Sequence, residues 1–223
     1  MIEVLSSFNC TKNTFFVSID IMDKYLTLTN SSYETKDIHL IGVTSMLLAS
    51  KMEEIVPFKV STVIEKMTHG KIQAKEVVKC EEDILKILNF ELLSSPSLFI
   101  FVEFLMVKLN FHVSAFYKDI TKVITYITKM VMHDYSTLIR FPLKYIACSC
   151  LYICFKIIEQ INANFKTKYY VEKMKEILSL NEQTFYSSSE VMLSLAKRFE
   201  RTFPFAKNLL KFDSFSLERN LRA

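Results

Sequence analysis

The sequence predicts an all-α fold built as two helical bundles of similar plan. Its 223 residues include only two glycines and four prolines, and this scarcity argues against a turn-rich β-sandwich or barrel. Half of the residues are hydrophobic and 23% are charged, which suits a globular chain with a large buried core. An internal repeat assigns the expected helices to two sets.

The repeat becomes visible when position 40 is laid over position 145. The segment LIGVTSMLLASKMEE (40–54) then aligns with YIACSCLYICFKIIE (145–159), so that Lys51 meets Lys156 and Glu54 meets Glu159. Small residues, which let neighbouring helices approach closely, coincide at Gly42 and Ala147, Thr44 and Ser149, Ser45 and Cys150, and Ala49 and Cys154. We therefore expect a matching helix in each half.

The helices that precede these segments are predicted by apolar residues at helical spacing. The same shift pairs Phe15 with Ile120, Ile19 with Ile124, Met22 with Ile127, and Leu26 with Val131. Either Thr11 or Asn13 is suited to cap the first of these two helices.

A further pair of helices is expected in each half, at about 59–67 with 73–89 and at about 169–178 with 181–202. Asn181 suits an N-cap because Glu182 and Gln183 follow it in the first turn. Between the halves, a new helix is expected with Pro96 at its first position and Ser94 or Ser95 as its cap. The predicted parts are thus 1–93, 94–203 and a basic tail at 204–223.

The apolar run from Tyr145 to Phe155 lies between Lys144 and Lys156, is too short to span a membrane, and predicts a buried helix. The chain opens without a secretory signal pattern, so we expect the protein to stay inside the cell. Its cysteines, at 10, 80, 148, 150 and 154, form no CxxC pair. We expect most of them to be small buried hydrophobes in a reducing compartment, with neither zinc nor disulfides.

The net charge of +4 comes from the end of the chain, where residues 197–223 hold seven basic and three acidic residues. A nucleic-acid-binding protein usually gathers Lys and Arg on one face of its fold. A solvated chain end explains this tail more simply.

Two opposite charges fall on apolar helix faces. One stripe consists of Leu40, Thr44, Leu47, Leu48, Lys51 and Ile55, and the other of Ala74, Val77, Val78, Glu81, Ile84, Leu85 and Leu88. An unpaired charge removed from water is costly, so Lys51 and Glu81 each need a partner or a route to solvent.

Two explanations of these charges stay open. Lys51 can reach solvent near its helix C-terminus and pair with Glu81 inside the same half. Alternatively, the two side chains are a matched donor and acceptor offered to the main chain of a partner protein at the rim of an apolar patch. Glu53 and Glu54 slightly favour the second explanation, because acids in the last turn of a helix oppose its dipole.

The residue patterns of catalytic sites are missing from the sequence. The histidines, at 39, 69, 112 and 133, fall in no HExxH or HxE pattern and accompany no CxxC pair, so no metal site is expected. Gly42 and Gly70 lie too far apart for a phosphate loop, a dinucleotide-binding loop or a nucleophile elbow. We interpret the chain as a binding protein without a cofactor, not as an enzyme.

The segment IHLIGVTSMLLASKMEEIVPFKV, followed by EVVKCEEDILKILNFEL, closely resembles the cyclin box of the A- and B-type mitotic cyclins. The signature is LLASKxEE, a proline, and then a helix of the form ME-x-x-[IVL]-L, in which Cys80 replaces the methionine. IDIMDKYL (19–26) is similar to another helix of that box, and MVMHDYSTLIRFPLKYIAC resembles the start of the second cyclin box. The resemblance extends to about residue 203.

The resemblance implies two tandem five-helix cyclin-box bundles, an N-terminal box at 1–93 with a truncated first helix and a C-terminal box at 94–203. It also implies a non-catalytic protein that binds and activates a cyclin-dependent kinase. By position, Lys51 and Glu81 match the charged pair that hydrogen-bonds the kinase backbone. Met52, Glu54, Leu85, Phe90 and Leu92 match further kinase-binding positions around that pair.

The family motif MRAILVDW is absent before the segment that begins at Ile2, and the chain contains no tryptophan. Only the flank of the substrate-docking patch, near Glu3 and Ile38, has matching positions. A truncated gene model, which we favour, and a genuinely minimal cyclin both explain this gap. Either explanation predicts weaker kinase binding than that of a full-length relative.

The expected function is that of a regulatory subunit that forms a heterodimer with a cyclin-dependent kinase and controls the cell cycle at the G2/M transition. Kinase substrates or inhibitors are possible further partners, the expected location is nucleus and cytoplasm, and no membrane partner is expected. One alternative is a transcription-factor-type cyclin fold that binds DNA or another protein without activating a kinase. Another is a helical scaffold in which Lys51 and Glu81 pair only with each other.

Overall fold

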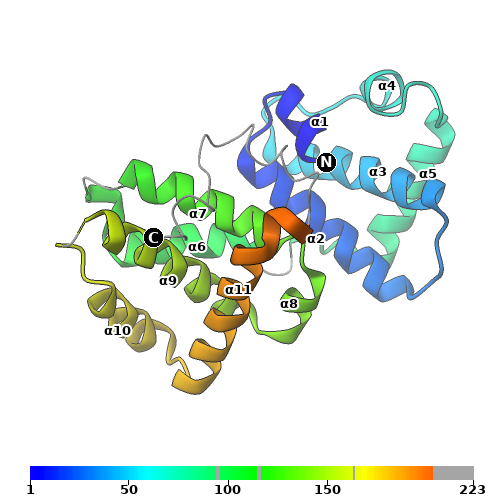
Figure 1. The fold of residues 1–223 in the computed structure, drawn as a ribbon. Helices are drawn as coiled ribbons and strands as arrows, with labels where there is room; N and C mark the ends of the chain where they lie inside the picture. Colours follow the sequence, from blue (N-terminus) through cyan, green and yellow to red (C-terminus); the bar gives the residue numbers. More distant parts are fainter. Residues whose placement is uncertain (94–95, 115–116, 163, 203–223) are drawn as a thin grey trace. The chain divides into compact units, whose positions relative to one another are not determined.

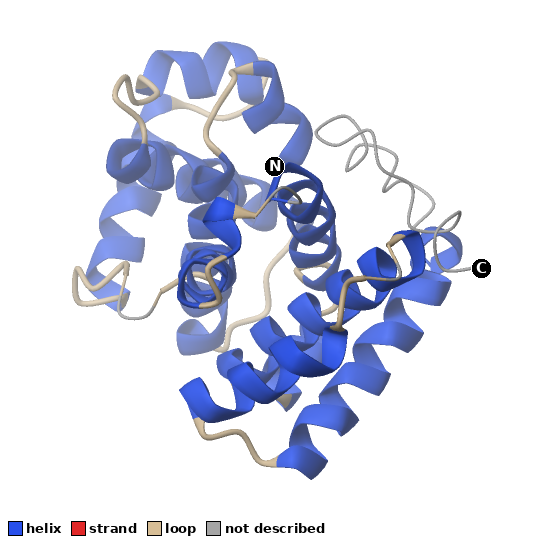
Figure 2. Cartoon of the chain, turned by 90° about the vertical axis from the view of Figure 1, so that its left-hand side faces the viewer, coloured by secondary structure: helices blue, strands red, loops and turns tan. Residues whose placement is uncertain are grey.

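A computed structural model describes residues 1–93, 96–114, 117–162 and 164–202. Within these ranges all regular secondary structure is helical, which confirms the predicted all-α class (Figures 1 and 2). The chain divides into two compact units, with the boundary between Ser97 and Leu98 rather than between positions 93 and 94. The predicted basic tail at 204–223 lies outside the described residues.

Unit 1 contains α1 (Ile2–Ser7), α2 (Lys12–Thr29), α3 (Thr35–Glu53), α4 (Val60–Thr62), the π-helix η1 (Val63–Met67) and α5 (Ala74–Ile87). Helix α3 packs against both α2 and α5. Every residue of α3 from Ile41 to Ser50 is buried, so this helix is the centre of the unit (Figure 1).

Side chains fix the starts of the long helices in unit 1. Thr11 is the N-cap of α2, and its hydroxyl oxygen accepts a hydrogen bond from the Thr14 backbone N–H at 3.4 Å. Helices α3 and α5 each begin with a capping box, formed by Glu34 with Asp37 and by Gln73 with Glu76. The sequence thus sets where α2, α3 and α5 begin.

Unit 2 contains α6 (Leu98–Lys108), the short 3-10 helix η2 (Phe111–Val113), α7 (Tyr117–Val131), α8 (Tyr135–Arg140), α9 (Leu143–Ile161), α10 (Thr167–Leu178) and α11 (Glu182–Thr202). Helix α9 packs against α6, α7, α10 and α11. It contains the apolar run from Tyr145 to Phe155 and is buried along most of its length, as predicted. Helix α9 therefore has the central place in unit 2 that α3 has in unit 1.

Aromatic and hydroxyl side chains fill the space around α9. Phe155 packs with Phe111, Phe165 and Tyr170 at ring-centroid distances of 5.0 to 5.6 Å. The Ser149 hydroxyl lies 2.7 Å from that of Ser188 on α11, which joins the two helices through a buried hydrogen bond.

Two predictions made from the sequence, for Ile55 and for Pro96, are wrong. Ile55 does not belong to the buried stripe of α3, because the helix ends at Glu53 and leaves Ile55 fully exposed. Pro96 is not the first residue of a helix, because α6 begins at Leu98 after Ser97, whose buried hydroxyl donates to Asn13 Oδ1 at 3.3 Å. The proposed caps Ser94 and Ser95 lie outside the described residues.

The predicted apolar stripe of α5 is displaced from its buried face. Ala74 and Val78 are exposed, whereas the buried side of the helix and its end is formed by Val77, Cys80, Ile84 and Leu88. The predicted apolar stripe is wider than the face of α5 that packs against α3. Its outer edge, which includes Val78, Glu81 and Leu85, therefore borders on solvent.

The fold also contains features that the sequence did not indicate. The short helix α8 between α7 and α9 was not predicted. At Gly42 the packing is not tight enough to require glycine, because an added Cβ would lie 3.6 Å from Met1 Cε and 3.9 Å from Met22 Sδ. These distances are ordinary van der Waals contacts.

Candidate functional site

The candidate site lies on unit 1, where the last turn of α3 faces α5. Lys51, in that last turn, forms an ion pair and hydrogen bond from its Nζ to Glu81 Oε1. The Lys51 side chain is 42% exposed and the Glu81 side chain 16% exposed. The pair thus lies at the surface edge of the interface between α3 and α5, where a partner could reach it.

The two acids that follow Met52 serve the start of α2. Glu54 Oε1 accepts hydrogen bonds from the Thr11 backbone N–H at 2.7 Å and from the Thr14 hydroxyl. Glu53 Oε2 accepts a hydrogen bond from Asn13 Nδ2 at 2.6 Å. A helix N-terminus favours negative charge, so these carboxylates stabilise α2.

This arrangement explains the paired acids without a partner protein. One oxygen of Glu54 is already occupied within the unit, and the predicted part of Glu54 in kinase binding stays a prediction. The sequence indicates Thr11 and Asn13 as candidate caps of α2. It does not indicate that acids forty residues away contact them.

Several exposed apolar side chains follow Lys51 in the chain or lie on α5 and in the turn after it. We use the name apolar rim for Met52, Ile55, Val56, Val78 and Phe90. Met52 is 40% and Val78 45% exposed, while Val56 and Phe90 are 81% and 72% exposed. Large apolar side chains that stay exposed are candidates for a protein-binding surface.

The other predicted apolar contacts are less accessible than Met52 and Phe90. Leu85 is partly buried and packs against the hydrophobic core of unit 1. Leu92 belongs to that core and is only 7% exposed. The structure therefore joins Lys51 to Glu81, leaves Met52 and Phe90 exposed, and places Leu85 one helical turn after Glu81 on α5 and Leu92 beneath the surface.

The turn after α5 determines where Phe90 points. Asn89 and Phe90 both have positive φ angles, 49° and 60°, in the left-handed region that residues with a Cβ rarely adopt. The Phe90 backbone N–H donates to the Leu85 carbonyl at 2.8 Å, which closes the end of the helix. After this left-handed turn, Phe90 is largely exposed to solvent.

The two predicted substrate-docking positions lie on α1 and α3. Glu3 is exposed, and Ile38 is 36% exposed near the start of α3. The Met1 side chain lies over Gly42, one helical turn after Ile38. Both positions are thus available at the surface, and their use in docking stays a prediction.

Cysteine chemistry and metal binding gain no support from the described part of the chain. Cys80, Cys148, Cys150 and Cys154 are buried free thiols, as predicted for most of the cysteines. Burial raises the pKa of Cys148 to about 12, which keeps this thiol protonated. The residues that the structure describes include no cluster of three His, Cys, Asp or Glu placed to hold a metal ion. Within the same residues, no helix combines the length and hydrophobicity needed to cross a membrane.

Sequence comparison places the candidate site inside a known family region. Residues 1–93 match the family described as "Cyclin, N-terminal domain". The chain is 34% identical over 105 residues to G2/mitotic-specific cyclin C13-1 of Daucus carota, an alignment that covers 47% of this chain and 30% of the relative. It is 26% identical over 161 residues to G2/mitotic-specific cyclin cig2 of Schizosaccharomyces pombe, covering 72% of this chain and 36% of the relative. These alignments span about a third of the curated relatives' length.

The fold is similar to that of a solved structure, the X-ray structure of a viral cyclin from herpesvirus saimiri. The TM-score is 0.62 at 21% sequence identity, and the match covers 87% of this chain and 81% of that chain. At this level of identity the likeness shows that the two chains share a fold.

Proposed function

Because residues 1–93 match the cyclin N-terminal domain family and the chain is similar to mitotic cyclins, we propose that it is the regulatory, activating subunit of a cyclin-dependent protein kinase. In this role it has no catalytic activity of its own. Its cell-cycle function would be exercised at the G2/M transition, in the nucleus and the cytoplasm, and kinase substrates or inhibitors would be further partners.

One observation carries this proposal: unit 1 presents an ion pair between α3 and α5 at its surface, together with the exposed side chains of the apolar rim. Burial of exposed apolar area contributes a hydrophobic free energy of about 25 cal/mol per Å², part of which offsets the entropy lost on association. The rim would supply that area, while Lys51 and Glu81 would fix the register on the partner. Charged pairs at interfaces contribute chiefly to specificity and to the rate of association.

The pairing of Lys51 with Glu81 in the free chain is compatible with a role in binding. A surface ion pair contributes only about 0 to 1 kcal/mol, so its exchange for hydrogen bonds to a partner costs little. Lys51 Nζ can donate to a backbone carbonyl, and the Glu81 carboxylate can accept from a backbone N–H. A cyclin that binds the active kinase conformation more tightly than the inactive one shifts the kinase population toward the active state.

The experiment that tests this proposal measures binding and activation of purified cyclin-dependent kinases by the wild-type chain and by Lys51→Ala and Glu81→Ala variants. We expect each substitution to weaken binding at least about tenfold, because each leaves a charged or polar group of the complex unpaired. The matched control is Lys36→Ala, since Lys36 pairs with Glu76 at 3.0 Å and also joins α3 to α5, in the first turn of each helix.

Thermal melts of the same proteins separate binding from folding. If the folded Lys51→Ala and Glu81→Ala variants activate the kinase as well as the wild type does, the pair is internal and the proposed interface is wrong. If the wild-type chain activates no kinase, the proposed function itself is wrong.

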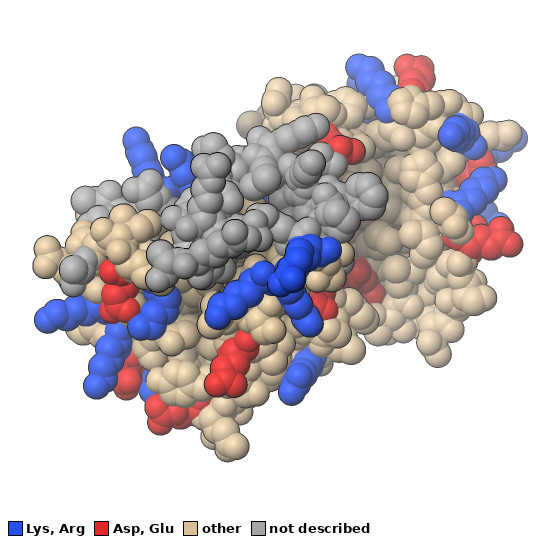
Figure 3. Space-filling view, viewed as in Figure 1, with Lys and Arg blue, Asp and Glu red and all other residues tan. Residues whose placement is uncertain are grey.

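Nucleic-acid binding, the alternative function, gains little support from the described surface. On the face drawn in Figure 3, Lys and Arg side chains are interspersed with Asp and Glu side chains. A nucleic-acid-binding face instead concentrates positive charge, and its affinity falls steeply with salt.

A further inference from the structure

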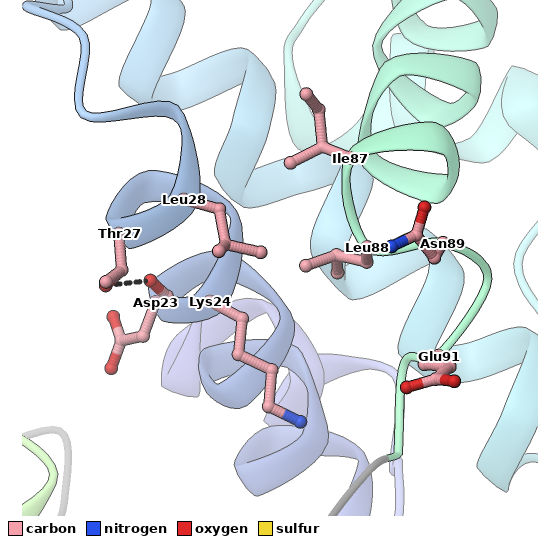
Figure 4. Close-up of a pocket in the computed structure, with 8 residues that line it drawn as sticks. All are labelled: Asp23, Lys24, Thr27, Leu28, Ile87, Leu88, Asn89 and Glu91. Atoms are coloured by element: carbon pink, nitrogen blue, oxygen red, sulfur yellow. Dashed lines mark hydrogen bonds between the residues drawn. The ribbon is translucent and has the colours of Figure 1, made fainter.

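A second surface feature of unit 1 is a groove between the ends of α2 and α5 (Figure 4). Asp23, Lys24, Thr27 and Leu28 line it from α2, while Ile87, Leu88, Asn89 and Glu91 line it from α5 and the turn that follows. Its volume is about 440 Å³. None of these eight residues belongs to the predicted kinase-binding or substrate-docking sets.

The walls of the groove are aliphatic. Leu28 and Leu88 point toward each other across the opening, with Ile87 beside them (Figure 4). Leu28 is 62% and Ile87 42% exposed, whereas Leu88 belongs to the core of the unit. An aliphatic side chain placed between the two leucines would therefore cover apolar surface that is in contact with water in the free chain.

The charges around this opening are mainly negative. The lining residues include two acids, Asp23 on the α2 side and Glu91 on the α5 side, and one cation, Lys24. The Lys24 ammonium group donates to the Leu92 carbonyl at 3.2 Å, so part of its charge is directed at the backbone beneath the groove. Burial raises the pKa of Asp23 to about 6, which means that its carboxylate would gain from a neighbouring cation.

The helix termini add to this negative potential. The groove lies at the C-terminal end of α2, which ends at Thr29, and at the C-terminal end of α5, which ends at Ile87. The C-terminal end of a helix carries partial negative charge and favours cations. Two helix ends and two carboxylates thus favour a ligand with positive charge.

The wall formed by the end of α5 is a left-handed turn. Asn89 lines the groove, and both Asn89 and Phe90 have positive φ angles. A left-handed residue is a common way for a helix to end, and Asn30 ends α2 in the same conformation. The turn keeps Leu88 facing Leu28 while it directs Phe90 to the surface.

We propose that this groove binds a short peptide segment of a partner protein in which an aliphatic residue lies next to a Lys or Arg. The aliphatic side chain enters between Leu28 and Leu88, and the cationic side chain interacts with Asp23 or Glu91. The inference goes beyond kinase activation and does not depend on it, because the groove uses separate residues.

The test is a fluorescence-anisotropy titration of the full chain with a labelled peptide of sequence Gly-Ser-Leu-Ala-Lys-Lys-Gly-Ser. Two matched peptides carry Ser in place of Leu or Glu in place of both Lys residues. We expect saturable binding of the first peptide, and at least about fivefold weaker binding of each matched peptide. Binding of the first peptide should also weaken as salt screens the charges.

Protein variants locate the binding to the groove. Leu28→Ser, and the double change Asp23→Asn with Glu91→Gln, should each weaken binding of the first peptide about fivefold or more. The control is Glu82→Gln, which removes an exposed acid of α5 outside the groove, and it should leave binding unchanged. Circular dichroism of each variant checks that the helices are retained.

Three results would overturn the proposal: no saturable binding of the first peptide, equal binding of the glutamate-containing peptide, or unchanged binding by the folded Leu28→Ser protein. The Lys51→Ala variant should bind the peptide as the wild type does. This last comparison separates a failure of the groove from a failure of the kinase interface.

Discussion

Replacement of Asp20 by Asn should stabilise unit 1, and the gain should grow with pH. Asp20 lies on α2, where burial raises the pKa of its carboxyl group to about 7. The positive charge of Lys24 counteracts this increase in part, and the negative charge of Asp23 adds to it. In an unfolded chain an aspartate has a pKa of about 3.9.

The sign of the effect follows from proton linkage. Between about pH 4 and pH 7 the folded chain binds more protons at Asp20 than the unfolded chain does, so the free energy of unfolding falls as pH rises. A shift of about three pKa units at about 1.4 kcal/mol per unit gives an upper limit of roughly 4 kcal/mol. Because Asp20 keeps some contact with water, we expect about 1 to 3 kcal/mol.

Asn has nearly the shape of a protonated Asp but does not ionise, so the variant avoids this cost. The assay is urea unfolding of the wild type and of Asp20→Asn, followed by far-UV circular dichroism, at about pH 5 and about pH 8.5. We expect a smaller stabilisation by the variant at the lower pH, about one pH unit into the range where the linkage acts, and the full stabilisation at the higher pH. Asp83→Asn, which removes an exposed acid of α5, is the control.

Two results would refute this reasoning. Equal stabilisation by Asp20→Asn at both pH values would mean that ionisation is not the cause of the gain. Destabilisation at the higher pH would mean that the charged carboxylate has favourable contacts in unit 1 that outweigh its desolvation.

Two further substitutions test the packing of unit 1 by the same unfolding assay. Glu54→Ala removes the acceptor of the hydrogen bonds from the Thr11 N–H and the Thr14 hydroxyl, so the free energy of unfolding should fall by about 1 to 2 kcal/mol. An unchanged free energy of unfolding would show that water replaces the carboxylate. Gly42→Ala should raise the free energy of unfolding by about 0.5 to 1 kcal/mol, because alanine favours the helix and its Cβ would contact only Met1 and Met22 at ordinary distances. A lower free energy of unfolding would show that these two side chains do not move aside.

The helices could be predicted from the sequence because their apolar residues repeat at helical spacing. Helix ends were less predictable, since they depend on local capping and not on the apolar pattern. At the end of α3, Ile55 continues the apolar spacing, yet Glu54 leaves the helix with extended backbone and its carboxylate binds the start of α2. A contact with a distant segment thus ended a helix that the local pattern would have continued.

The candidate site was predictable in part for the same reason. Lys51 and Glu81 could be singled out because each interrupts an apolar stripe, and the structure joins them. Phe90 and Leu92 illustrate what could not be predicted, because both are apolar and only two residues apart. Phe90 is 72% exposed and Leu92 is 7% exposed, and the turn between α5 and Leu92 has positive φ angles at Asn89 and Phe90. These angles cannot be predicted from the residue types.

The charged residues that correspond in the internal repeat make different contacts in the two units, and this difference is relevant to function. Lys156, the counterpart of Lys51, pairs at 2.8 Å with Glu159 three residues later on its own helix. Glu159 Oε1 also accepts a hydrogen bond from the Thr167 backbone N–H at the start of α10. In unit 2 this acid therefore joins the lysine to a following helix start.

In unit 1 two different acids make these contacts, one with a helix start and one with the lysine. Glu54, the counterpart of Glu159, holds the start of α2, and this leaves Lys51 to reach across to Glu81 on α5. Of the two arrangements, that of unit 1 places the ion pair of the lysine between two helices. A pair between two helices can serve packing alone, as Lys36 with Glu76 does, so the binding and melting of the Lys51→Ala and Glu81→Ala variants decide whether the arrangement in unit 1 serves a partner.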